Sequence, residues 1–497
     1  MHFYLEKPFA WFIIRVVLNF VKELLMTDYR IERDSLGDLR IPKDAYYGAN
    51  AYRAYENFKI TGKAMDPYFI RAIVEIKKAC AIQNNKVGIL SDKKSKAIVA
   101  ACDEVLAGSY IEDFIVDPIQ GGAGTSFNMN ANEVIANIAN VDLGGTLGHY
   151  EHIHPNDHVN LGQSTNDVIP TAGKIAIIRY IEDLAEDTEK LIAALDKKAE
   201  DFDDYVKMGR TQLQDAVPIT LGQEFKAYSR VVERGLLRFK EAIKELSSIN
   251  LGGTAVGTGL NADDEFVENI DKVLREITGL DLKQAEDLID STQNLDGFLF
   301  TSSVLKTFAA SLSKVANDLR LLSSGPTTGI SDFKLPAKQA GSSIMPGKVN
   351  PVIPEVVNQV AFLVVGNDLT VTMAVEAGQL ELNAFEPIIF YALIQSITTL
   401  RGAIQTLTVN CIEGITANKE KLRAKVENSV GIITAFAPHI GYDMASTIAK
   451  ESMREGRPIR DLILEKGLMT SAEVDKILDY RKMTKPGILD EEHMETH

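Results

Sequence analysis

The chain has 497 residues, 45% hydrophobic and 25% charged, which is typical of a soluble globular protein with about two to four domains. Its formal net charge of −16 argues against nucleic acid and anionic membranes as partners, because both would be repelled. The three cysteines, Cys80, Cys102 and Cys411, are too few and too scattered for a disulfide framework or a zinc cluster, so we expect a cytoplasmic protein.

The N-terminal segment, residues 1–25, is apolar but does not match a secretory signal. Glu6 and Lys7 precede the apolar run, Arg15 interrupts it, and no small-residue cleavage site follows. The run between charges is also too short to span a bilayer. We interpret the segment as an extension ahead of a start at Met26, with a membrane-surface helix as the alternative.

From Tyr29 to about Asp157 the sequence pattern is mixed, and we expect loops around YYGAN and IQGGAGTSFNMN. The glycine-rich part of the second loop, residues 121–126, is followed by no GK[ST] and lacks the spacing of a dinucleotide fingerprint, which disfavours a nucleotide site. Its glycines let backbone amides approach an anion, so together with Thr125 they could hold a carboxylate. A plain tight turn is the alternative.

Half of the chain's eight histidines lie within HYEHIHPNDH, at positions 149, 152, 154 and 158. Their spacing matches no HExxH motif and no cysteine lies nearby, so we disfavour a metal site.

Five consecutive polar residues, Gln163 to Asp167, follow the histidine-rich stretch. Such side chains are costly to bury without partners, and Ser, Thr and Asn suit the N-cap of a helix that we expect to begin near Val168. A helix N-terminus also attracts carboxylates. The pattern alone is compatible with either a solvated cap or an anion site.

Long windows with apolar residues at helical spacing fill the centre of the chain: residues 224–247, 295–322, 351–374 and 387–412. Each is roughly twice the average helix length of about 11–12 residues, which indicates a bundle of long helices. The stretch VVNQVAFLVVGNDLTVTMAV is apolar on more than one face, so we expect it to be buried on all sides, in a bundle formed between subunits. From residue 415 onward the pattern predicts a small helical domain.

Residues 341–351, GSSIMPGKVNP, place hydroxyls, a lysine and an asparagine among glycines and prolines before an apolar helix. Such a polar loop on a rigid scaffold is typical of a functional site. This stretch resembles the signature of the fumarase/aspartase superfamily. From Tyr29 onward the chain resembles that family in four further stretches, in the family's order: RIERDSLGDLRIPKDAYYGAN, GGAGTSFNMNANE, HPNDHVNLGQSTND and MGRTQLQDAVP.

The resemblance implies an all-α protein of three domains, which we place at residues 26–163, 164–414 and 415–497. It implies that the central domain contributes five long helices to a twenty-helix core in a homotetramer. Active sites in this family are assembled from loops of three subunits. The implied partner is a small dicarboxylate substrate, with neither nucleic acid nor membrane involved.

The family's reaction removes a proton beside one carboxylate and expels an amine or a hydroxyl from the next carbon, leaving fumarate. The aci-carboxylate that forms must be stabilised by preorganised donors. By match, Ser342 is the catalytic base, and the amides of Gly341, Ser343 and Ile344 lie where they could hold the developing charge.

The remaining roles also come from the match. Lys348 and Asn350 bind the other carboxylate, which Thr211 supports, and the lysine supplies a local positive charge on an acidic protein. Ser164 and Thr165 hold the reacting carboxylate. The residues that face the leaving group are Thr125, Asn166 and Gln212.

Weaker candidates are Arg53, for added positive charge, and the residues that match a second carboxylate-binding element of fumarases, His154, Asn156 and Asp157. No cofactor is required by the resemblance and no metal site is expected; activation by Mg²⁺ is left open.

Three departures from the fumarase pattern indicate ammonia as the leaving group. Gln212 stands where fumarases carry a histidine, and because glutamine does not titrate, a relay to Glu355 is excluded. The chain also reads STND and GAGTS where fumarases usually read SSND and GSGTQ. We therefore expect conversion of aspartate to fumarate and ammonia. Hydration of fumarate is the first alternative, and a helical scaffold without activity is the second.

Overall fold

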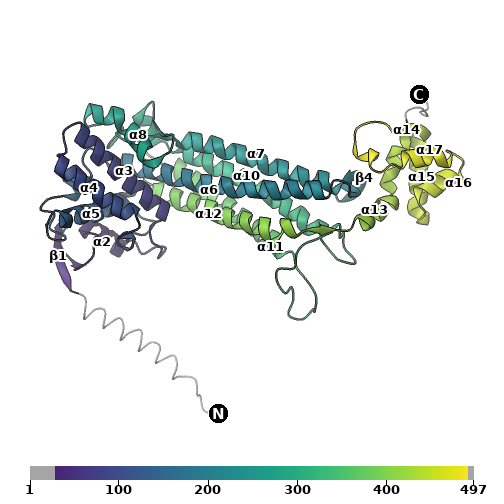
Figure 1. The fold of residues 1–497 in the computed structure, drawn as a ribbon, viewed down its shortest axis with the longest axis horizontal. Helices are drawn as coiled ribbons and strands as arrows, with labels where there is room; N and C mark the ends of the chain where they lie inside the picture. The colour runs from purple at the N-terminus through teal and green to yellow at the C-terminus, as the bar shows by residue number, and fades with distance from the viewer. Residues whose placement is uncertain (1–27, 491–497) are drawn as a thin grey trace, which may run out of the picture. The chain divides into compact units, whose positions relative to one another are not determined.

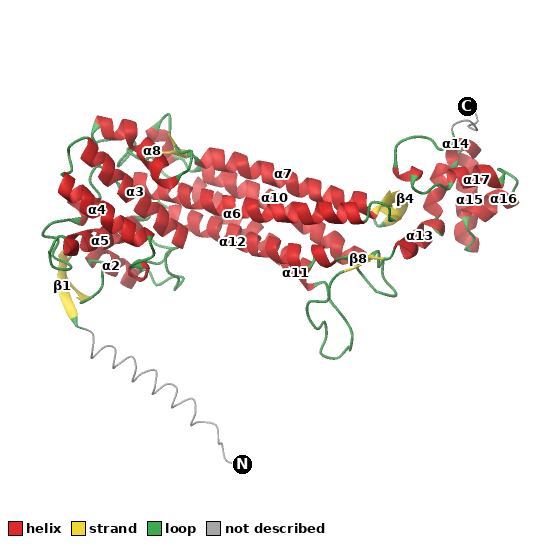
Figure 2. Ribbon diagram, in the orientation of Figure 1, coloured by secondary structure: helices red, strands yellow, loops and turns green. Residues whose placement is uncertain are grey.

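The computed structural model describes residues 28–490, so the interpretation of residues 1–25 lies outside the described part of the chain. The expected all-α fold is confirmed (Figures 1 and 2). Its helices are α2 (Ala49–Asn57), α3 (Pro67–Lys86), α4 (Asp92–Leu106), α5 (Thr125–Asp142), α6 (Thr165–Asp201), α7 (Leu221–Leu246), α8 (Asp264–Thr278), α9 (Leu288–Gln293), α10 (Asp296–Leu322), α11 (Val352–Glu376), α12 (Glu386–Asn410), α13 (Lys419–Glu427), α14 (Ala437–Ile440), α15 (Tyr442–Glu455), α16 (Ile459–Glu465) and α17 (Ser471–Ile477).

Strands are few and short in the described residues, and they pair two by two. Three pairs are antiparallel, β1 with β2, β3 with β4 and β7 with β8, whereas β5 and β6 run parallel. Their bounds are β1 (Tyr29–Asp34), β2 (Gly37–Pro42), β3 (Val206–Thr211), β4 (Gln214–Thr220), β5 (Ser248–Ile249), β6 (Lys283–Gln284), β7 (Phe333–Lys334) and β8 (Thr416–Ala417).

The chain divides into two compact units, and the division falls within the five helices α6, α7, α10, α11 and α12. The first unit comprises the residues up to Tyr180, Ala242–Ser302 and Asp368–Gln395, and the second comprises Ile181–Glu241, Ser303–Asn367 and the residues from Ser396 onward. The division into three domains proposed from the sequence stays a prediction.

In the first unit, α3 packs against α4, α5 and α8. Asp66 caps α3 by accepting hydrogen bonds from the amides of Tyr68 and Phe69, and Pro67 fits the first turn because its missing N–H is not needed there. α6 and α12 approach closely at Gly173, where a Cβ would lie 2.3 Å from the ring of Phe390. This close approach explains a glycine inside a helix.

In the second unit, polar side chains tie the long helices together. Lys226 of α7 pairs with Asp196 of α6 at 2.6 Å, and Arg401 of α12 pairs with Asp183 and Asp187 of α6 at 2.6 and 3.1 Å. Partly exposed pairs of this kind add little to stability on their own.

α11 leaves large apolar side chains uncovered in the single chain. Phe362, Leu369 and Met373 are 67%, 62% and 65% exposed. α11 and residues 386–414 are also long and apolar enough to cross a membrane, a test that the core helices of soluble proteins pass as well. The all-round apolar pattern predicted a helix buried on all sides, whereas the single chain leaves this face of α11 uncovered.

The predicted C-terminal helical region is present and has its own core within the second unit. Val426, Ile432, Phe436 and Ile463 are buried there, together with Met208 from β3. The strand pair β3–β4 is therefore anchored to the C-terminal helices.

One expectation about the first region was only half right. The stretch IQGGAGTSFNMN was predicted as a loop. Residues 119–124 form a loop, but the rest of the stretch belongs to α5, which begins at Thr125. Asn130 is buried in that helix, where it accepts a hydrogen bond from the amide of Ile115 and donates to the carbonyl of Asp113. Tertiary partners thus satisfy an asparagine whose helix propensity is low.

Candidate active site

Thr125 lies at the first turn of α5, directly after a turn that only glycines make easily. Gly122 and Gly124 have φ of 86° and 81°, and a Cβ on Gly124 would lie 2.7 Å from Ile169 of α6. The Thr125 hydroxyl donates to the carbonyl of Gly122 at 2.6 Å. The turn thereby places an exposed threonine and the N-terminus of α5 beside α6.

The residues Ser164, Thr165 and Asn166 lie together at the start of α6, which begins three residues earlier than predicted. Asp167, fully buried, accepts hydrogen bonds from the amides of Ser164, Gly252 and Thr254 at 2.9–3.1 Å. Burial raises the pKa of Asp167 to about 6, although these amides favour the ionised form. Asp167 thus fixes the loop that carries the three candidates.

Pro170 lies inside α6 and cannot donate to the carbonyl of Asn166. The side chain of Asn250 supplies the missing donor at 3.0 Å. Asn166 itself donates to the carbonyl of Ala255 at 2.7 Å. Asn166 is consequently held at both its backbone and its side chain.

A buried polar cluster lies behind this loop, and sequence reasoning did not find it. Lys77 of α3, fully buried, donates to the side-chain oxygens of Asn128, Asn160 and Gln163 at 2.7, 2.9 and 2.9 Å. Asn128 in turn donates to the hydroxyl of Thr165 at 3.3 Å. The only signal in the sequence is a lysine at an apolar position of the helical pattern AIVEIKKACA.

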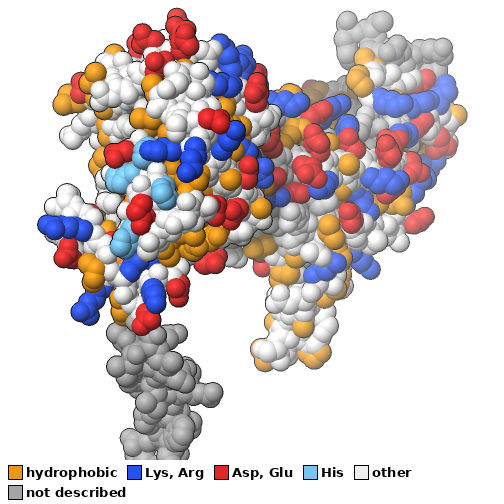
Figure 3. All heavy atoms as spheres, turned by 60° about the vertical axis from the view of Figure 1, so that its left-hand side comes forward, with side chains coloured by type: hydrophobic (Ala, Val, Ile, Leu, Met, Phe, Trp, Pro, Cys, Tyr) orange, Lys and Arg blue, Asp and Glu red, His pale blue; other side chains and the backbone are white. Residues whose placement is uncertain are grey.

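The residues that match the second carboxylate-binding element of fumarases lie on and beside the short turn of residues 154–159 and are partly or fully exposed. His154 Nδ1 accepts a hydrogen bond from the amide of Asp157 at 3.2 Å, and both Asn156 and Asp157 are exposed. The ring of His158 accepts from the amide of His154, and burial followed by the charge of Lys94 lowers the pKa of His158. Figure 3 shows histidine side chains gathered on one face with Lys and Arg beside them.

Arg53 forms an ion pair within this chain. It contacts Asp34 at 2.6 and 3.0 Å and donates to the carbonyl of Gly37. Its charge is therefore largely balanced.

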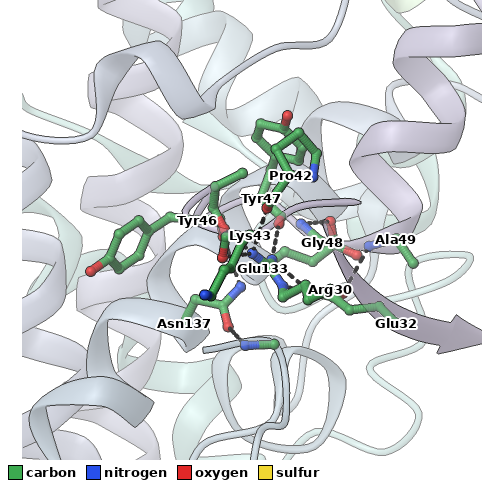
Figure 4. Close-up of polar contacts among 12 residues, drawn as sticks. Arg30, Glu32, Pro42, Lys43, Tyr46, Tyr47, Gly48, Ala49, Glu133 and Asn137 are labelled. Atoms are coloured by element: carbon green, nitrogen blue, oxygen red, sulfur yellow. Dashed lines mark hydrogen bonds and ion pairs between the residues drawn. The ribbon is translucent and has the colours of Figure 1, made fainter. Parts of the chain in front are cut away.

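The segment that leads into α2 is held by two charged groups (Figure 4). The guanidinium of Arg30 binds Glu32 and the carbonyls of neighbouring loop residues, including that of Tyr47. Glu133 of α5 accepts from the amides of Gly48 and Ala51 and from both the amide and side chain of Asn50. Burial raises the pKa of Glu133 to about 7. This network joins α2 to the helix that carries Thr125.

In the second unit, Thr211 and Gln212 lie at the exposed tip of the β3–β4 hairpin. Gln212 and Leu213 have φ of 53° and 66°, as a two-residue hairpin turn requires. The base of the hairpin is anchored by Lys207, which is buried between Glu224 and Asp332 at 2.8 and 3.0 Å.

The loop at 341–350 is closed by one backbone hydrogen bond and by one from the side chain of Asn350. The amide of Gly341 donates to the carbonyl of Lys348 at 3.0 Å, and Asn350 donates to the carbonyl of Gly341 at 2.7 Å. A Cβ on Gly341 would lie 2.2 Å from that Lys348 oxygen, so no other residue fits. The tip, including Ser343 and Lys348, is exposed.

Ser342 Oγ accepts hydrogen bonds from the amides of Ile344 and Met345 at 3.2 and 3.0 Å. Two backbone donors aimed at one oxygen favour its ionised form. Ile344 therefore contacts the serine in this conformation, whereas the sequence assigned its amide to the developing charge of the substrate. Glu355, on α11, lies 4.0 Å from Arg320.

Within the first unit the structure thus brings together Thr165, Ser164 and Asn166, and within the second it brings together Ser342 and Asn350. Among the described residues no group of three or more His, Cys, Asp or Glu side chains is arranged to hold a metal ion. The donors are hydroxyls, amides and one lysine, which suit carboxylates.

Comparisons with known proteins agree with these motifs. A family model described as lyase matches residues 37–366, and one described as fumarase C C-terminus matches residues 432–485. Aspartate ammonia-lyases from a Bacillus species and from Bacillus subtilis are 52% and 50% identical over 93% and 94% of this chain, and 99% and 98% of their own lengths.

Solved structures show the same relationship. A fumarate lyase/delta crystallin from Brucella melitensis bound to cobalt is 47% identical, with a TM-score of 0.90 over 92% of this chain and all of that one. A class II fumarase from Schistosoma mansoni is 35% identical, with a TM-score of 0.88 over the same shares.

Proposed function

Because this chain belongs to the fumarase/aspartase family of lyases, we propose that it is an ammonia-lyase, which converts L-aspartate reversibly to fumarate and ammonia. The observation that carries the proposal is about 50% identity, over nearly the full length, to aspartate ammonia-lyases of several species. Gln212, in place of the fumarase histidine, favours an amine as leaving group. Fumarate hydration is the second candidate, supported by the likeness to the Schistosoma mansoni fumarase.

In the proposed mechanism Ser342 removes the proton beside the β-carboxylate. A free hydroxyl ionises too weakly for this task, so it needs donors and a dry site. The amides of Ile344 and Met345 supply two such donors. Closure of the exposed loop over the substrate excludes water, and Gly347, at φ 80°, gives the loop tip its turn.

The product of proton removal is an aci-carboxylate with two negative charges on one group. Ser164 and Thr165, at the positive end of the 37-residue helix α6, bind that group and stabilise it as the charge grows. Lys348 and Asn350 bind the second carboxylate, with Thr211 beside them. Thr125, Asn166 and Gln212 contact the amine that leaves.

The proposed active form is a homotetramer with sites shared by three subunits. The uncovered apolar side chains of α11 support this assembly, because a monomer would leave them in water. The reaction needs no cofactor, and Mg²⁺ is at most an activator. The three cysteines are buried and free, which fits a reducing cytoplasm.

The direct test is stoichiometric release of fumarate and ammonia from L-aspartate by the purified protein, compared with Ser342→Ala. We expect equal amounts of both products from the wild type. The alanine variant should lose at least about 1,000-fold in kcat, as is typical when a nucleophile or base is removed. Its tetramer should be intact by size-exclusion chromatography. A variant within tenfold of wild type would contradict the role of Ser342.

A further inference from the structure

Lys77 is a buried cation whose three donors are all used. Its Nζ contacts the oxygens of Asn128, Asn160 and Gln163 at 2.7–2.9 Å, and an ammonium group has three protons. All three partners are neutral amides. Among the described residues no ion pair to Lys77 is found, and Asp167, the nearby carboxylate, is held by the amides of Ser164, Gly252 and Thr254 instead.

The lysine fixes which way the amides point. An ammonium group can only donate, so the oxygen of Asn128 must face it and the NH₂ group must face away. That NH₂ group lies 3.3 Å from Thr165 Oγ1 and 3.1 Å from Asn160 Oδ1. A further amide, Asn132, donates to the same Asn160 oxygen at 3.2 Å. The orientation therefore propagates from Lys77 to the first residue of α6.

The orientation of Asn128 decides what the Thr165 hydroxyl can do. A hydroxyl has one proton and two acceptor positions. Because Asn128 donates to Thr165 Oγ1, it occupies one acceptor position and directs the hydroxyl proton elsewhere. In the proposed reaction that proton is the one offered to the reacting carboxylate. With the amide reversed, Thr165 would have to donate to Asn128.

The charge of Lys77 is also unusual for a residue with only a structural role. Burying a cation without a carboxylate partner is strongly unfavourable, and a methionine of similar length would fill the space without that cost. Burial lowers the pKa of Lys77 to about 8, so the ammonium form still predominates at neutral pH. A buried cation whose hydrogen-bond partners are all neutral amides is therefore better explained by the groups that its three donors orient than by packing alone.

We propose that Lys77 is a positioning residue for this reaction: through Asn128 it holds the Thr165 hydroxyl as a donor to the reacting carboxylate. The inference rests on the proposed function. It deepens that function by assigning the stabilisation of the reacting carboxylate partly to a residue that does not touch substrate.

The first test compares Lys77→Met with a matched control, Lys174→Met. Lys174 is also a buried lysine of the first unit, but its Nζ donates to the backbone carbonyl of Ser248 at 2.6 Å. We expect Lys77→Met to lower kcat about 100-fold, as for loss of a preorganised donor, with KM changed less than about threefold. Lys174→Met should change kcat less than about threefold. Equal losses in kcat would overturn the proposal.

A double-mutant cycle with Thr165→Val distinguishes two explanations for a loss of kcat. One is an effect passed from Lys77 through Asn128 to Thr165, here called the relay, and the other is a general weakening of the fold. If Lys77 acts through the Thr165 hydroxyl, the double variant loses little more kcat than Thr165→Val alone. Losses that multiply would contradict the relay. Should Lys77→Met fail to assemble, Asn128→Leu, which removes the donor to Thr165 and leaves Lys77 in place, replaces it in the same cycle.

These outcomes are distinct from a failure of the proposed function. Wild-type turnover of aspartate tests the function by itself. If the wild type acts on malate instead, the same comparison is made with malate, because the carboxylate beside the reacting carbon is the same.

Discussion

At the scale of single residues, the ion-pair cluster of Asp332 makes the stability of the fold depend on pH. Burial alone would raise the pKa of Asp332, but the charges of Lys207, Arg210 and Lys425 hold that pKa below its ordinary value. A carboxyl with a lowered pKa stabilises the fold above the unfolded value of about 4, and that stability is lost as pH falls through the folded pKa.

We therefore expect Asp332→Asn to lower the unfolding free energy at pH 7 by about 3 kcal/mol, as when a buried pair loses one partner. The difference between variant and wild type should shrink below pH 4. Thermal denaturation between pH 3 and pH 8 measures both; a constant difference across that range would contradict the assignment.

Among single residues, the sequence was most informative where chemistry needs a particular side chain in a loop. Ser342, Lys348 and Gln212 were assigned from motifs, and their roles stay predictions. Lys77 was missed. A lysine within an apolar helix looks like an exposed position, and its partners come from segments 50 or more residues away.

At the scale of elements, the long helices were predictable and the start of α5 was not. The windows 295–322 and 387–412 agree with α10 and α12 to within about two residues, because apolar periodicity over so many turns is unambiguous. α5 begins in a stretch whose glycines and asparagines favour a loop. Tertiary hydrogen bonds to Asn128 and Asn130 outweigh that local preference.

The close packing of α6 against α12 at Gly173 can be tested by a substitution that adds one methyl group. We expect Gly173→Ala to destabilise the protein by about 1–3 kcal/mol, because its Cβ would overlap the ring of Phe390. The control is Gly402→Ala in α12, where no atom lies within 4 Å of the added Cβ and better helix propensity should stabilise slightly. Differential scanning calorimetry distinguishes them; similar shifts in Tm would be inconsistent with this packing.

At the scale of the whole molecule, the uncovered apolar face of α11 is the surface on which the proposed assembly depends. The sequence predicted a helix buried on all sides, and the single chain leaves Phe362 exposed. We expect Phe362→Glu to dissociate the proposed tetramer and to abolish activity, because a buried unpaired charge would be strongly unfavourable at a helix interface.

The control for this substitution is Tyr442→Glu, at a side chain that is 82% exposed and lies outside the helices of the bundle. It should leave both mass and turnover unchanged. Light scattering coupled to size-exclusion chromatography reports the mass; an active Phe362→Glu monomer would contradict the shared-site assembly.

Whether ammonia or water leaves the carbon next to the reacting one is decided by fumarate formation, followed by ultraviolet absorbance, from L-aspartate and L-malate supplied separately to the same preparation. We expect turnover of aspartate and none of malate, and we expect Gln212→His to change kcat/KM for aspartate by at least about fivefold. Turnover of malate alone would show that water is the leaving group and would identify the protein as a hydratase.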